Sequence, residues 1–262
     1  MSPTPHDRTL LEQSRAYYWY HAIELAPGVV TDGDYDMSSV IEHYGLPLRF
    51  SGGGGGPETV LDVGCASGYF SFECERRGAA VTATELASFL DWDFVGGAVR
   101  REEMQQRIGD PEAFTRTHIT GAFRFAHQAL HSKVRPKSCR VYDLDPALFA
   151  GETFDFVLGG SIMSHVRDPV LALERLRAVT RQTCILAVPT TGSRKATEAP
   201  IMHFVGMADP DRRSWWVLTD SCLVAMLRAA NFASVEIVSH FDLVNRREKG
   251  LVVPHTVVHA RP

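Results

Sequence analysis

A short run with two glycines, Val60–Tyr69, has the residue types of a ligand-binding turn. Its strand-like first half ends at Gly64, and a helical pattern follows Gly68, which is the context in which glycines let a backbone approach a ligand closely. The G-x-G-x-x-G pattern of pyrophosphate sites does not fit, because that register puts its second and third glycines at Ala66 and Tyr69. The acidic Asp62 favours a ligand with cationic groups.

Three other strand ends carry residues suited to the same ligand. Glu85 follows a second strand-like segment, 23 residues after Asp62, and a carboxylate there can accept hydrogen bonds from both hydroxyls of a ribose. Asp143 and Leu144 follow a third strand-like segment, and Gly159-Gly160 follows a fourth. Singly, such an acid is more often a helix cap or a solvated charge. Four strand ends in this order favour one shared site at the carboxyl edge of a sheet.

Alternating strand and helix patterns must position these residues. We expect strands over 58–64, 80–84, 139–142, 153–158 and 183–188, helices over 69–77, 168–180 and 219–230, and an antiparallel pair of strands over 235–238 and 251–259. Before them lie a helix over 7–20 and a flexible run of five glycines and a proline at 51–57. The pattern predicts an α/β fold, a doubly wound and mostly parallel sheet with helices on both faces.

Composition narrows the class of protein. The chain has 262 residues, 45% of them hydrophobic, and a net charge of −4, which is ordinary globular usage. No apolar run is long enough for a membrane span and no signal core begins the chain, so we expect a soluble cytoplasmic protein without a membrane partner. The net negative charge does not indicate nucleic-acid binding, although a local basic patch would allow it. Five cysteines without C-x-x-C spacing, and His255 and His259 without a third ligand, predict no metal site.

The glycine run resembles motif I of class I S-adenosylmethionine (SAM)-dependent methyltransferases, with Ala66 in place of the usual middle glycine. This resemblance implies a Rossmann-like seven-stranded sheet, SAM as cofactor and S-adenosylhomocysteine (SAH) as product. It places Glu85 on the ribose, Asp143 and Leu144 on the adenine, and Gly159 and Gly160 on the methionyl part. The cofactor-binding residues that it implies are Asp62, Gly64, Cys65, Ala66, Gly68, Glu85, Leu86, Asp143, Leu144, Gly159, Gly160 and Trp19.

Segments outside motif I resemble the tRNA wobble-uridine methyltransferase-like family. They are Trp19–Leu25 with the following Gly28–Thr31, Leu158–Pro169, and the pair Trp215-Trp216. In that family the segment before motif I lies over the SAM pocket. Members that transfer a carboxymethyl group have a lysine where His21 falls, so its absence favours plain methyl transfer. The label also covers many small-molecule methyltransferases, which leaves the substrate class open.

Two histidines are candidate catalytic residues. A hydroxyl or ammonium acceptor must lose a proton, and a histidine with its usual pKa near 6.5 suits that role. His165 comes first, because it follows the fourth strand at the ligand-binding edge; the alternative is a structural hydrogen bond to backbone. His21 comes second, with contact to the SAM carboxylate or simple packing as its alternatives.

The acceptor pocket is expected to involve a long stretch at about 190–214, which lacks periodicity and has the length of a functional loop. The aromatic run at 17–21 has polar tips that suit a pocket wall, and aromatic faces also suit a sulfonium. Core packing under a surface loop is the alternative. The expected substrate-pocket residues are Tyr20, His203, Phe204, Trp215 and Trp216.

The resulting hypothesis is a SAM-dependent methyltransferase acting on a small-molecule acceptor, with O-methylation of a secondary metabolite as the favoured reaction. Residues 1–50 would form a helical cap, 51–57 a linker, and 58–262 the SAM-binding core. Modification of a tRNA wobble base is the first alternative, with Arg100-Arg101 and Arg246-Arg247 as seeds of a basic surface. A non-catalytic SAM-binding protein is the second alternative. An NAD-linked oxidoreductase is the third, because Glu85 could bind the ribose of NAD as well as that of SAM.

Overall fold

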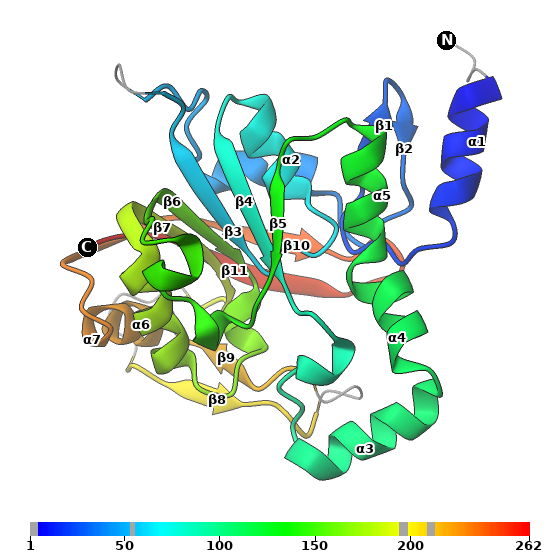
Figure 1. The fold of residues 1–262 in the computed structure, drawn as a ribbon. Coiled ribbons are helices and arrows are strands. Elements are labelled where there is room, and N and C mark those ends of the chain that lie inside the picture. The colour runs from blue at the N-terminus through cyan, green and yellow to red at the C-terminus, as the bar shows by residue number, and fades with distance from the viewer. Residues whose placement is uncertain (1–4, 53–55, 194–198, 209–212) are drawn as a thin grey trace.

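The protein is described here from a computed structural model, which covers residues 5–52, 56–193, 199–208 and 213–262 (Figure 1). Residues 53–55 of the predicted linker and parts of the predicted acceptor-pocket stretch lie outside the described residues. Among the described residues, no helix is long and apolar enough to cross a membrane. The same part of the chain holds no group of three or more histidine, cysteine, aspartate or glutamate side chains arranged to bind a metal ion.

A seven-stranded sheet with the order β10-β11-β7-β6-β3-β4-β5 forms the centre of the molecule. Strands β3 to β7 run parallel to one another, whereas β11 pairs antiparallel with both β7 and β10. This arrangement confirms the predicted fold class, including the antiparallel pair at the end of the sheet. The strands are β3 (Thr59–Val63), β4 (Ala80–Glu85), β5 (Arg135–Ser138), β6 (Phe154–Gly160), β7 (Thr180–Pro189), β10 (Ser234–Val244) and β11 (Val252–Arg261).

Helices cover both faces of the sheet, because alternate strand residues are apolar on each side. On one face, Val60, Val81 and Ile185 belong to a core that also holds residues of α2 and α5. On the other, Leu61 and Leu186 pack with residues of α6 and α7 (Figure 1). The helices are α1 (Pro5–Ser14), α2 (Tyr69–Arg76), α3 (Gly97–Ile108), α4 (Pro111–Phe114), α5 (Gly121–Ala129), α6 (Pro169–Val179) and α7 (Asp220–Ala229).

The N-terminal segment is less helical than expected. Helix α1 ends at Ser14, so the prediction of a helix through residue 20 is wrong for the aromatic run at 17–21. That run is an extended strap: Tyr18 N donates to Thr117 O at 2.9 Å, and His21 forms a bridge to Tyr35. Its aromatic side chains contact rings that are distant in sequence, such as Tyr18 with His118 and Tyr20 with Tyr35. The hairpin β1 (Glu24–Ala26) and β2 (Val29–Val30) follows, and then come two 3-10 turns, Met37–Ser39 and Ile41–Tyr44.

Two other boundaries also differ from expectation. The third strand lies at 135–138 rather than 139–142, and residues 141–143 form a 3-10 turn instead. This strand lies at the edge of the sheet and contains a proline, which cannot donate a backbone hydrogen bond to a neighbouring strand. Its sequence therefore predicts a strand only weakly. The stretch at 190–214 contains the short strand β8 (Met202–Phe204), which pairs with β9 (Trp216–Leu218) in a hairpin.

Candidate functional site

The glycine run forms a tight turn between β3 and α2. The amides of Gly64 and Cys65 both donate to Thr84 O of the next strand, at 2.9 and 3.0 Å. Ala66 adopts a left-handed φ of 49°, which explains why most chains of this pattern place glycine there. Gly68 begins α2 at φ 90°, and a Cβ on it would lie 2.6 Å from the Phe72 ring. The turn therefore brings bare backbone to the carboxyl edge of the sheet.

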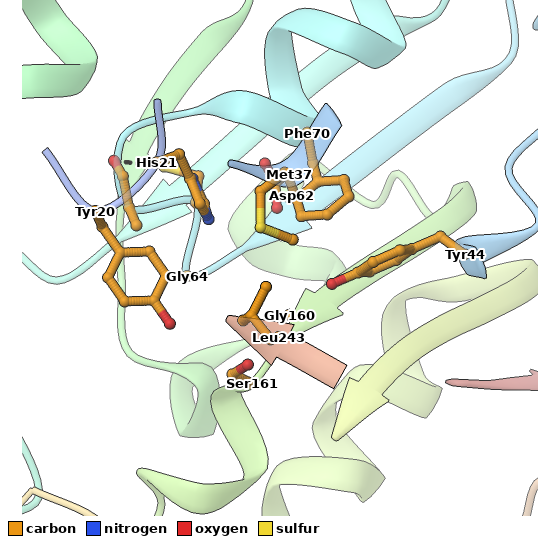
Figure 2. A pocket seen from close by; sticks show the side chains of 12 residues that line it. Tyr20, His21, Met37, Tyr44, Asp62, Gly64, Phe70, Gly160, Ser161 and Leu243 are labelled. Carbon is orange, nitrogen blue, oxygen red and sulfur yellow. Dashed lines mark hydrogen bonds between the residues drawn. The ribbon is translucent and has the colours of Figure 1, made fainter. Parts of the chain in front are cut away.

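A recess opens directly on this turn (Figure 2). It holds about 370 Å³ of unfilled space, part of it open to solvent. Its walls come from the strap, the 3-10 turns, β3, the glycine turn, α2, the end of β6 and β10. The lining residues are Tyr20, His21, Met37, Tyr44, Asp62, Gly64, Cys65, Ala66, Phe70, Gly160, Ser161 and Leu243.

Two buried carboxylates mark the turn. Asp62 is 3% exposed, and burial raises its pKa to about 6, although the Ser71 hydroxyl donates to it at 2.5 Å. Glu85 accepts from Ala66 N at 2.9 Å and from Leu86 N at 2.8 Å, while burial raises its pKa above the usual value. Each Glu85 oxygen keeps a second lone pair, so the carboxylate can still accept hydroxyl donors.

The imidazole of His21 is an unsatisfied polar group in the recess wall. The residue is 6% exposed, and its Nδ1 has no hydrogen-bond partner among the described residues. Burial lowers its pKa to about 3, so the ring is neutral at neutral pH. Figure 2 shows the ring turned toward the recess, as is the hydroxyl of Tyr44 on the facing wall. A buried polar atom without a partner carries a penalty that a bound ligand can remove.

Ser67 connects the strap to the glycine turn, and the sequence analysis did not single it out. Its buried hydroxyl accepts from the amides of Tyr20 and His21, at 2.9 and 3.3 Å. The side chain therefore fixes the strap over the recess. Its place inside the glycine run was the available signal, since a serine there can bond backbone that crosses the turn.

The structure brings many of the predicted residues together. Gly68 and Gly159 lie close beneath the recess, where added side chains would strike Phe72 and Leu186. Glu85 and Leu86 adjoin it through the hydrogen bond to Ala66. The predicted residues that line the recess are Tyr20, His21, Asp62, Gly64, Cys65, Ala66 and Gly160.

Three residues expected on the cofactor do not line the recess. Trp19 is 2% exposed and donates to Ser14 O at 2.8 Å, so it packs in the core instead of facing the recess. Asp143 is half-exposed, and its ion pair with Arg140 holds the pKa of its carboxyl below the usual value. Leu144 is fully buried in the second core. Asp143 and Leu144 lie at the end of the 3-10 turn after β5 and not directly at the end of the strand.

Of the residues expected in the acceptor pocket, Tyr20 lines the recess and the other four lie apart from it. His203 and Phe204 are on the exposed strand β8. The half-buried Trp215 and Trp216 donate their indole N–H groups to Asp93 O and Val166 O, at 2.7 and 3.1 Å. In Figure 1 their hairpin lies below the sheet, on the same side as α3. These residues form an aromatic cluster at the carboxyl edge, with Phe204 and Trp216 ring centroids 5.5 Å apart.

His165 lies between these two regions and does not line the recess. It ends the 3-10 turn Ile162–Ser164, and its Nδ1 lies 3.1 Å from Arg213 O. A carbonyl only accepts, so Nδ1 of His165 carries a proton and donates it to Arg213 O. The ring is 6.4 Å from that of Trp92.

Sequence comparison identifies the family. A family model described as a methyltransferase domain matches residues 37–237, so the chain belongs to this methyltransferase family. The matched range includes the glycine turn, Glu85 and the end of β6, but it does not include the strap. No match was found among curated proteins.

Solved structures with the same fold agree with this class. The N-terminal domain of EvdMO1, described in the presence of SAH and D-fucose, is 18% identical with a TM-score of 0.58, and the match covers 100% of both chains. Full EvdMO1 is 19% identical with a TM-score of 0.51, over 97% of this chain and 47% of that one. Magnesium protoporphyrin IX methyltransferase from Synechocystis PCC 6803, with bound SAM, is 14% identical over 86% and 78%, with a TM-score of 0.49. The family match, together with the seven-stranded sheet, identifies the chain as a SAM-dependent methyltransferase of the class I fold.

Proposed function

We propose that the protein transfers the methyl group of SAM to a hydroxyl oxygen of a small-molecule acceptor, with the cofactor bound at the recess on the glycine turn. The observation that carries this proposal is the set of polar groups around that turn. Glu85 has spare lone pairs for the hydroxyls of a sugar, Asp62 supplies a buried acid, and His21 offers an unpaired nitrogen. The EvdMO1 domain with SAH and D-fucose supports a small acceptor by analogy of fold.

The chemistry needs little beyond alignment and removal of one proton. The attacking oxygen displaces the sulfonium in line, forming the new C–O bond as the C–S bond breaks, and SAH leaves as a neutral thioether. The enzyme therefore gains most by holding donor and acceptor in register and by accepting the hydroxyl proton.

His165 suits the role of proton acceptor better than His21 does. Its Nδ1–H is held by Arg213 O, and it stands at the carboxyl edge of the sheet. The pKa of about 3 at His21 makes that ring a weak base, so we assign it to ligand binding. The aromatic cluster of Phe204, Trp215 and Trp216 lies on the His165 side and would meet an acceptor held there.

The test is a labelled-methyl assay against small-molecule and tRNA fractions, with His165→Ala and His21→Ala compared at saturating SAM. We expect label in a small molecule, a loss of at least a hundredfold in turnover for His165→Ala, and a smaller loss for His21→Ala. Full turnover by both variants would remove the histidine assignment.

Label in tRNA alone would overturn the small-molecule proposal. It would favour the wobble-base alternative carried by the sequence resemblance, and binding should then weaken steeply with salt. Tight SAH binding with no label in any fraction would instead favour a non-catalytic SAM-binding protein.

A further inference from the structure

Ser161 is an unusual residue in the wall of the recess. It follows Gly160 at the end of β6 and adopts a left-handed φ of 55°, a conformation that costs about 1 kcal/mol for a residue with a side chain. Its amide donates to Ala187 O at 2.7 Å, which fixes the backbone. The strained turn directs the Ser161 hydroxyl to the boundary between the recess and β11.

His255 holds that hydroxyl from behind. It lies on β11, is 3% exposed, and its Nε2 is 2.8 Å from Ser161 Oγ. Its Nδ1 is 2.8 Å from Val253 O, and the Phe241 ring stacks on it at 5.0 Å and 7°. The imidazole therefore has one orientation, fixed by a backbone carbonyl, a packed ring and a serine.

The direction of the hydrogen bonds follows from these contacts. A carbonyl only accepts, so Nδ1 of His255 carries the ring proton and Nε2 is an acceptor. Burial lowers the pKa of His255 to about 4, so the ring is neutral at neutral pH. Ser161 must then donate its only proton to His255, and its oxygen presents only lone pairs to the recess.

This makes one side of the recess a surface of acceptors. The Asp62 carboxylate and the Ser161 oxygen both line it, and no lysine or arginine is among the lining residues of the described chain. The Tyr20 hydroxyl also reaches Ser161, but a hydroxyl oxygen has two lone pairs. A protonated amine is the ligand group that such a surface recognises, and SAM carries one on its methionyl part.

We infer that Ser161 accepts a hydrogen bond from the ammonium group of the bound methyl donor, and that His255 is the positioning residue that holds Ser161 in this acceptor role. The inference rests on the proposed function, because it needs the cofactor to occupy the recess. It assigns a task to a serine and a histidine that lie 94 positions apart and that the sequence analysis did not connect.

The test compares SAH with its analogue that lacks the α-amino group, by titration calorimetry on the full chain. Ser161→Ala should weaken SAH binding by about 10- to 100-fold, the usual loss for a hydrogen bond to a charged group. The same variant should bind the desamino analogue as the wild type does. His255→Phe should match Ser161→Ala, and His255→Gln, which keeps an acceptor in that direction, should restore most of the affinity.

Two further variants separate this role from simple packing. Thr256→Val removes a buried hydrogen bond with Asp220 on the next residue of β11, so it should lower the melting temperature and leave SAH affinity unchanged. The double variant Ser161→Ala/His255→Phe should bind SAH no more weakly than Ser161→Ala alone, because the pair acts as a unit.

The outcomes distinguish the two proposals. Unchanged SAH affinity in folded Ser161→Ala, or an equal loss for SAH and the desamino analogue, would overturn the inference and leave the proposed function intact. Absence of SAH binding by the wild type would overturn the proposed function, and this inference with it.

Discussion

Buried acids at the two edges of the central sheet have pKa values shifted in opposite directions. At the amino edge, Asp155 of β6 accepts from Thr59 N, Thr59 Oγ1, Arg181 Nε and Gln182 Nε2, at 2.9, 3.0, 2.8 and 2.6 Å. Burial alone would raise its pKa, but the hydrogen bonds from Arg181 and Thr59 outweigh burial and lower it. At the carboxyl edge, burial raises the pKa of Asp62 to about 6, and Nδ1 of His21 stays unpaired.

This contrast separates stability from function within one sheet. A satisfied acid ties three strands together and strengthens the fold, whereas under-satisfied groups weaken the free protein and gain partners when a ligand binds. This contrast supports the proposal that the carboxyl edge holds the ligand.

The largest effect is expected at the amino edge. Asp155→Ala leaves Arg181, Gln182 and Thr59 without their shared acceptor, and should lower the free energy of unfolding by about 3–5 kcal/mol in urea titrations at pH 7. SAH affinity should not change. Because the native pKa of Asp155 is depressed, its contribution exists above the unfolded pKa near 4, and the difference between variant and wild type should shrink as pH falls below that value. Glu112→Ala, which breaks an exposed ion pair with Arg116, is the control and should cost less than about 0.5 kcal/mol.

Asp62→Asn should act in the opposite direction. The native pKa of about 6 lies above the unfolded value, so the stability associated with the protonated acid is present below pH 4 and is lost as pH rises through 6. The uncharged amide avoids that loss. The variant should exceed the wild type by about 2–3 kcal/mol at pH 8 and by almost nothing at pH 4. Calorimetry should show at least tenfold weaker SAH binding. A variant less stable than the wild type at pH 8 would contradict the contrast between the edges.

Removal of the Ser67 hydroxyl tests how the strap is held. Ser67→Ala deprives the amides of Tyr20 and His21 of their acceptor and should cost about 1–2 kcal/mol. Hydrogen exchange should quicken in residues 17–23 and change little in β6 and β7. If exchange quickens equally throughout the sheet, Ser67 supports the whole fold and not the strap. Ser38→Ala, at an exposed turn, serves as the control.

The smallest effect is expected at Ala66. Glycine accepts its φ of 49° without strain, but glycine also gains more freedom in the unfolded chain. Ala66→Gly should therefore change the free energy of unfolding by less than about 1 kcal/mol, and SAH affinity by less than threefold. A larger loss of affinity would mean that the Ala66 methyl group itself contacts the ligand.

Much of the fold could be predicted because buried parallel strands have apolar runs and helices have periodic ones. The strand ends at Gly64, Glu85 and Gly160 were correctly located for this reason. The third strand was missed because Arg135–Ser138 is a short edge strand with polar residues and a proline, while the apolar Val141 belongs to a 3-10 turn. The strap was taken for a helix because aromatic residues at 17–21 satisfy helical spacing, although their partners lie far away in sequence.

The site could be predicted only where it is local. The glycine turn and Asp62 are adjacent in sequence, so their types and order reveal them. Tyr44, Ser161 and His255 reach the recess or its wall from distant elements, and no local pattern connects them. Trp19 shows that nearness in sequence can also mislead. Its neighbours Tyr20 and His21 line the recess, whereas its own ring packs in the core.

The most direct test of the account is a calorimetric titration of SAH into the wild type and into Glu85→Ala, with NADH as the competing ligand. We predict one SAH bound per chain, at least a tenfold loss of affinity when the Glu85 carboxylate is removed, and no heat from NADH. Binding of NADH in preference to SAH, or equal SAH affinity in the two proteins, would contradict the claim that this edge of the sheet holds the methyl donor by its sugar.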